Sequence, residues 1–243
     1  RVDLSALPAE ERAALGHLVE AARIVDALFL RQRSPATPAQ LLARVGDDSA
    51  LGRARRAYFA LNKGPWSELD HDRPFIPGAA VKPGGGNFYP LDATREEIDA
   101  WMRTLSGAEH TAATGFFTTI RRTPDGKLTA VPYSMEYQGE LAELARQLRE
   151  AAALTQQPTL KRYLETRAAA FLSNDYYASD IAWMELDASI EPTIGPYEVY
   201  EDEWFNFKAA FEAFIAVTDA GETAQLARFG KDLQGLENRL PIN

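Results

Sequence analysis

The sequence predicts an α+β fold that is predominantly α-helical and contains a small β-hairpin element. Apolar residues recur at spacings of three and four along most of the chain, which is typical of amphipathic helices. Two β-rich runs are joined by Pro124-Asp125-Gly126, a strong hairpin signal. With 46% hydrophobic residues among 243, the chain can build the core of one large domain or two small ones.

Four regions are predicted along the chain. They are N-terminal helices (1–61), a loop rich in Pro, Gly and aromatic residues (62–92), an α+β part (93–200) and a helical hairpin (201–243). In the first region, an apolar stripe from Leu15 to Phe29 predicts one helix, and 34–38 ends it. A second, basic helix is predicted over 51–61. The loop at 62–92 is either a packed Ω-type loop held by Trp66, Phe75 and Phe88 or a functional loop.

The third region begins with a helix that Thr94 and Glu97 cap. The hairpin strands are predicted at 116–122 and 127–133, and two helices follow, striped by leucines at 141–148 and 160–164. The stretch 190–196 contains two prolines and is predicted to be irregular.

The fourth region is predicted to be helical throughout. Trp204, Phe207, Phe211 and Phe214 recur at helical spacing and predict one helix. Asp219 and Glu222 are expected to begin a last helix. Its apolar stripe consists of Leu226, Phe229, Leu233, Leu236 and Leu240.

Composition excludes several classes of partner and site. The net charge of −9 disfavours nucleic acid and anionic membrane surfaces as partners and attracts cationic groups. No apolar run approaches the ~20 residues of a membrane helix, and the compartment, cytoplasmic or periplasmic, stays open. Without cysteine there is no thiolate chemistry, and the three histidines lack metal-ligand spacing. No complete catalytic centre, metal site or cofactor is therefore predicted within this chain.

The most unusual charge pattern lies between Ala168 and Phe207, which holds carboxylates and no Lys or Arg. The carboxylates are Asp175, Asp180, Glu185, Asp187, Glu191, Glu198, Glu201, Asp202 and Glu203. Such a run is either a solvated face or, because aromatic residues interleave with it, a wall that binds an ammonium group.

Several motifs in this region resemble the dipeptidyl peptidase III family. The matching residues are Ser179-Asp180, Trp183, Ile190-Glu191-Pro192-Thr193-Ile194-Gly195-Pro196-Tyr197-Glu198 and the run Lys208–Val217. Upstream, Gly64-Pro65-Trp66 and Asn87-Phe88-Tyr89-Pro90 look like bacterial members of the group. The resemblance is clearest over roughly the last 70 residues and implies a two-lobed zinc exopeptidase that removes dipeptides from free amino ends.

The zinc motif of that family, H-E-x-x-G-H, does not occur in this chain. The resemblance therefore implies that residues 93–200 belong to the non-zinc lobe and that 201–243 lead toward a catalytic lobe. Zinc is expected in that missing lobe, and the chain alone is expected to be inactive. The implied partners are that lobe and a peptide with a free N-terminus.

The resemblance also implies the site residues. In the family, the Glu of the E-x-x-I-G motif holds the substrate ammonium, which corresponds to Glu191; Thr193 and Gly195 complete the predicted substrate-binding set. The family has a Tyr two residues after that Glu, where this chain has Thr193. Two readings from other classes stay open: a non-catalytic peptide-binding or protein-binding module of the same fold, and an enzyme that uses an unrecognised carboxylate site.

Overall fold

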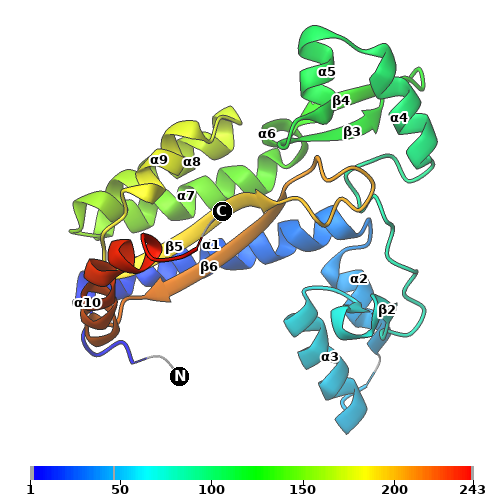
Figure 1. The fold of residues 1–243 in the computed structure, drawn as a ribbon. Helices are drawn as coiled ribbons and strands as arrows, with labels where there is room; N and C mark the ends of the chain where they lie inside the picture. Colours follow the sequence, from blue (N-terminus) through cyan, green and yellow to red (C-terminus); the bar gives the residue numbers. More distant parts are fainter. Residues whose placement is uncertain (1–2, 46, 242–243) are drawn as a thin grey trace.

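The computed structural model describes residues 3–45 and 47–241, and it confirms a mainly helical α+β fold (Figure 1). The helices are α1 (Ala9–Arg33), α2 (Pro38–Leu42), α3 (Ala50–Asn62), α4 (Arg95–Thr104), α5 (Gly107–Thr114), α6 (Tyr133–Glu136), α7 (Gln138–Leu154), α8 (Pro158–Ser173), α9 (Tyr177–Met184) and α10 (Ala220–Glu237). The strands are β1 (Trp66–Ser67), β2 (Arg73–Pro74), β3 (Thr118–Arg122), β4 (Leu128–Pro132), β5 (Ile190–Glu198) and β6 (Ala210–Val217). Within these residues the strands form antiparallel pairs, β1–β2, β3–β4 and β5–β6. Residues 1–2 and 242–243, at the outer ends of the first and last predicted regions, lie outside the described residues.

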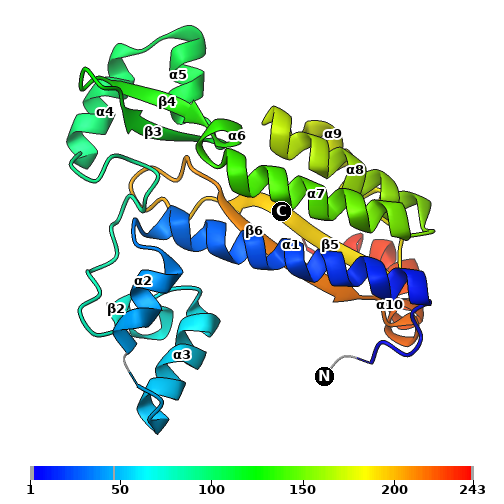
Figure 2. The same cartoon turned by 180° about the vertical axis from the view of Figure 1, so that it is seen from behind.

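The main body is built on the long helix α1. It packs beside α7, which in turn packs beside α8, and the β5–β6 pair lies across α1 (Figures 1 and 2). The face of α1 that is turned to this core is apolar, and its buried residues are Ala14, Leu18, Ala21, Val25 and Leu28. At the ends of α1, Glu10 and Glu11 lie in the first turn and Arg31 and Arg33 in the last, which suits the helix dipole.

Most predicted elements of the first three regions are confirmed. The two predicted N-terminal helices are α1 and α3, and the predicted hairpin is β3–β4. Thr94 caps α4 by accepting from the backbone N–H of Glu97, whereas the Glu97 carboxylate binds Arg122 and does not close a capping box.

The 62–92 loop is a packed structure, with Trp66 and Phe88 buried and Phe75 half-buried. Trp66 Nε1 donates to the carbonyl of Ala80 at 2.8 Å, which closes the loop across its middle. Together with α2 and α3, the first part of the loop forms a small module at the end of α1 with an apolar cluster of its own, whereas Phe88 belongs to the main core (Figure 1). That cluster consists of Leu30, Leu41, Val45, Phe59 and Ile76.

Two predictions near the C-terminus are wrong. The stretch predicted to be irregular at 190–196 is the strand β5, and the helix predicted from Trp204 to Phe214 is replaced by a loop and the strand β6. The region 201–243 is therefore not a helical hairpin. The aromatic residues that predicted the helix recur at spacings of three and four. The segment that forms β6 is also short and rich in Phe, Ile and Val, and such a run is equally compatible with a strand.

The prolines of β5 fit the strand because their backbone faces away from β6. Tyr163 Oη bonds both the N–H and the C=O of Ile194, so these groups point to the outer edge of β5. Residues two apart in an antiparallel strand share that direction, which places Pro192 and Pro196 at outward positions. Neither proline therefore removes a hydrogen bond from the β5–β6 ladder.

The last predicted helix is confirmed as α10. Asp219 Oδ1 accepts from the N–H groups of Gly221 and Glu222 at 2.8 and 3.1 Å, as an N-cap does. Its predicted apolar stripe is solvent-exposed, with Leu226 and Phe229 at 70% and 67% exposure. The apolar face of α10 thus has no cover in the described part of the chain.

Candidate functional site

The predicted site residues lie together on one face of the β5–β6 pair. Ile190 and Ile194 point into the core on the α1 side and are fully buried. Glu191, Thr193 and Gly195 alternate with them and so share the opposite face. We call this second surface the open face; Glu191 is exposed on it.

Two aromatic side chains flank the middle of the open face. Trp183, on α9, donates from Nε1 to Thr193 Oγ1 at 3.2 Å. Phe214 lies directly opposite Thr193 on β6 and is 65% exposed. At the start of β5, Thr218 Oγ1 donates to Glu191 Oε1 at 3.4 Å. The open face therefore presents the carboxylate of Glu191, the hydroxyl of Thr193 and the rings of Trp183 and Phe214.

Gly195 is on the open face but is covered. A Cβ atom at this position would lie 2.8 Å from Arg167 Nη1 and 3.2 Å from the ring of Tyr197. The glycine is buried, and its missing side chain makes room for the Arg167 guanidinium. We therefore interpret Gly195 as a packing position, and its contact with a peptide stays a prediction.

A β-bulge adds a carboxylate to the open face. Pro196 pairs with Phe211 and Glu198 with Ala210, so Tyr197 is an extra residue in β5. The bulge reverses the alternation of side chains and turns Glu198 to the side of Glu212. Burial, and then the negative charge of Glu198, raise the pKa of Glu212 above its usual value.

Glu198 entered the sequence prediction only as one member of the acidic run, and Glu212 was not predicted as a candidate site residue. The signal for Glu198 was available, since Glu198-Val199-Tyr200 has a Tyr two residues after a Glu, the spacing that Glu191 and Thr193 lack. Tyr200 is 59% exposed, and its pKa is raised by partial burial and by nearby carboxylates, among them Glu198 and Glu212. Glu212 carried no such signal, because it lay in the run that was predicted to be helical.

The acidic run is not a continuous wall. Asp180 pairs with Arg167, Glu185 with Arg162, and both Glu201 and Glu203 with Lys82. Asp202 is buried and accepts from Tyr89 and from four backbone N–H groups. In the described residues, Glu191, Glu198 and Glu212 have no Lys or Arg within ion-pair distance. The open face is thus left with unpaired negative charge.

The described residues do not assemble a metal site. No three His, Asp or Glu side chains in this part of the chain lie close enough together to hold an ion. Among the same residues no helix combines the length and apolar character needed to cross a membrane.

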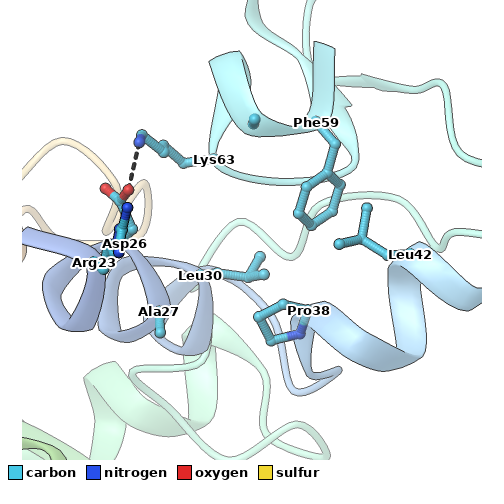
Figure 3. A pocket seen from close by; sticks show the side chains of 9 residues that line it. Arg23, Asp26, Ala27, Leu30, Pro38, Leu42, Phe59 and Lys63 are labelled. Atoms are coloured by element: carbon cyan, nitrogen blue, oxygen red, sulfur yellow. Dashed lines mark hydrogen bonds and ion pairs between the residues drawn. The ribbon is translucent and has the colours of Figure 1, made fainter. Parts of the chain in front are cut away.

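A cavity of about 300 Å³ lies elsewhere, between α1, α2 and α3 (Figure 3). Leu30, Leu42 and Phe59 form its apolar wall, and a 2.6 Å ion pair between Lys63 and Asp26 lies at its edge. It contains none of the predicted site residues, and its only charged groups are already neutralised by neighbours.

Comparisons with known proteins relate the chain to peptidases. Residues 113–243, more than half of it, match the model of Peptidase family M49. The structure of dipeptidyl-peptidase III from Corallococcus sp. strain EGB is 62% identical with a TM-score of 0.90, over 100% of this chain and 45% of that one. The corresponding enzyme of Caldithrix abyssi is 45% identical with a TM-score of 0.89, over 99% and 45%. A protein of Arabidopsis thaliana named Nudix hydrolase 3 is 37% identical over 98% of this chain and 37% of its own length. The chain thus spans less than half the length of each of these relatives.

Proposed function

Because the chain belongs to peptidase family M49, we propose that it is the part of a dipeptidyl peptidase III-like hydrolase that binds the amino end of a peptide. The observation that supports this proposal is the open face of β5–β6, where Glu191, Glu198 and Glu212 carry no ion-pair partner among the described residues. A dipeptidyl exopeptidase has to measure its cut from the substrate ammonium, and a free carboxylate is the natural acceptor of that group.

The residues around Thr193 suit the peptide chain that follows the ammonium. Because Thr193 Oγ1 accepts from Trp183 Nε1, its own hydroxyl hydrogen is free to donate to a peptide carbonyl. The exposed rings of Trp183 and Phe214 offer apolar surface to a peptide side chain. The expected Glu191 and the additional Glu198 are both candidates for the ammonium acceptor.

Zinc is implied by the resemblance, and the residues that the structure describes do not fit it. They bring no three metal-ligating side chains together. We place the metal in the part of the polypeptide that corresponds to the remaining length of the relatives.

Two uncovered surfaces support a second lobe as the partner of this chain. The outer edge of β6 pairs with no strand in the described residues, and its run Ala213–Val217 has no proline or charge that would block pairing. The apolar stripe of α10 is likewise exposed. A non-catalytic peptide-binding module of the same fold remains the alternative, because the carboxylates would attract an ammonium group without zinc as well.

The test replaces each candidate carboxylate by its neutral isostere in the complete polypeptide, as E191Q and E198Q. Substitution of the ammonium acceptor should raise KM for peptides with a free amino end by roughly tenfold or more, since a charged hydrogen bond contributes ~1.5–3 kcal/mol. Affinity for the same peptides with an acetylated amino end should not change. An unchanged KM in both variants would overturn the proposal. Zinc content and dipeptide release of the unmodified polypeptide distinguish the peptidase from the binding module.

A further inference from the structure

Arg167, on α8, is a fully buried cation beside the open face. The rings of Tyr163, Tyr176 and Tyr197 surround its guanidinium, whose central carbon lies 5.4–5.5 Å from each ring centroid. Nη2 donates to Asp180 Oδ1 at 2.6 Å, and the Asp180 side chain is 48% exposed. In the described part of the chain, Arg167 thus has a single anionic partner, the half-exposed Asp180 of α9.

The rest of the guanidinium is turned to β5. Nη1 occupies the space that a side chain at Gly195 would fill, and neither Nη1 nor Nε has a hydrogen-bond partner in the described residues. A buried arginine normally satisfies most of its five donors, so this packing is costly for the fold. Its position must therefore depend on the tyrosine rings and on the glycine beneath it.

One of those rings belongs to the extra residue of the bulge. The Arg167 guanidinium stacks on the ring of Tyr197, and the same ring would lie 3.2 Å from a Cβ atom at position 195. The backbone at Tyr197 determines to which side the next residue, Glu198, points. Arg167 therefore contacts the two positions, 195 and 197, that together set the course of β5 just before Glu198.

We propose that Arg167 is a positioning residue for Glu198: it holds the bulge at Tyr197 and thereby directs the Glu198 carboxylate to the open face. The inference rests on the proposed function, since Glu198 must be the carboxylate that binds the peptide amino end. It also explains why position 195 is glycine, because any Cβ there would displace the guanidinium.

The test measures KM and kcat of the complete polypeptide for a peptide with a free amino end. The variants are R167M, E198Q, E191Q and the two double variants that combine R167M with either glutamate substitution. Methionine keeps much of the length of the side chain and removes the charged, planar guanidinium. The matched control is R162M, since Arg162 is on the same helix but 59% exposed in an ion pair with Glu185. We expect R167M to raise KM about tenfold with kcat within about twofold, and R162M to change neither.

The double variants separate positioning from general stability. R167M/E198Q should have the same KM as E198Q alone, whereas R167M should multiply the KM of E191Q. G195A, which forces the guanidinium out of its place, should act like R167M and serves if R167M does not fold. An unchanged KM in a folded R167M or G195A, or effects of R167M and E198Q that multiply, would overturn the inference. If E198Q itself leaves KM unchanged, the inference fails; the proposed function fails only if E191Q has no effect either.

Discussion

At the scale of single residues, Asp202 and Lys208 are buried ionisable groups with several hydrogen-bond partners each, in contrast to Arg167. Asp202 is fully buried and accepts from Tyr89 Oη at 2.7 Å and from the N–H groups of the turn that leads into β6. Lys208, also fully buried, donates to the carbonyls of Ala113 and Gly115 and to Thr118 Oγ1 at 2.7–3.0 Å. Both side chains pin the loop between β5 and β6, which carries Tyr200.

Lys208 makes the stability of the fold depend on pH. Burial, which exceeds the opposing effect of Asp202, lowers the pKa of Lys208 to about 7. The unfolded chain, with a lysine pKa of ~10.4, then binds more protons than the folded chain between these two values. The contribution of Lys208 to stability should therefore rise with pH across this window, by at most ~1.4 kcal/mol per pH unit, and stay constant below pH ~7.

Urea denaturation of the wild type and of K208M at pH 6.5, 8 and 9.5 measures this effect. The difference in the free energy of unfolding between the two proteins should grow in favour of the wild type as pH rises. K127M is the control, because Lys127 is 80% exposed and pairs only with its neighbour Asp125. A difference that is the same at all three pH values would show that Lys208 stays protonated throughout.

The candidate site could be predicted only in part at this scale. The sequence motif pointed to Glu191 and Thr193, and both lie on the open face. The contact predicted for Gly195 comes from the family motif, and nothing in the sequence relates this position to Arg167, which lies 28 positions earlier. Glu198 faces the same surface only because of the bulge, and a one-residue register change cannot be read from side-chain alternation.

At the scale of elements, the long helices could be predicted and the β5–β6 hairpin could not. Amphipathic stripes of α1, α7 and α8 extend over several turns, so their period was unambiguous. β5 contains two prolines, which argue against a central strand, and only its outward-facing backbone makes them compatible. The pairing with β6 decided the structure of both segments, and pairing is a tertiary property.

The orientation of the backbone in β6 leads to a prediction with an internal control. Phe211 N–H donates to Gln32 Oε1, away from β5, and Ala213 shares that outward direction. Ala216 lies opposite Glu191 and has the other direction. In this chain A213P should lower the free energy of unfolding by about 1 kcal/mol or less, and A216P by about 2–4 kcal/mol, because only the second loses a ladder hydrogen bond.

Chemical denaturation of the two proline variants, each against the wild type, provides the measurement. Equal losses of stability would contradict the assignment of the outer edge. In the complete polypeptide, A213P should become as costly as A216P if a strand of the proposed second lobe pairs with β6.

At the scale of the whole molecule, a network of ion pairs joins α1, the 62–92 loop and the segment after β5. Arg33, at the end of α1, lies 3.0 Å from Glu201, and Lys82, in the 62–92 loop, contacts both Glu201 and Glu203 at 3.0–3.1 Å. Lys82 also pairs with Asp72 of the same loop, at 3.3 Å. The segment after Glu198 is thereby fixed to elements that are far apart in sequence, which connects the frame of the fold to the end of the open face.

The apolar stripe of α10 provides a test of how this chain fits into a larger protein. Phe229 is 67% exposed here, so F229E should change the free energy of unfolding of this chain by less than about 0.5 kcal/mol. In the complete polypeptide, a second lobe that covers α10 would bury the ring, and the same substitution should then cost at least ~3 kcal/mol. R228Q, at an exposed neighbour on the same helix, should have little effect in either form. Denaturation of both forms with both variants decides the matter: if F229E were harmless in the complete polypeptide, α10 would not be the contact between the lobes. The exposed edge of β6 would then be left as the surface that joins this chain to the remainder of the protein.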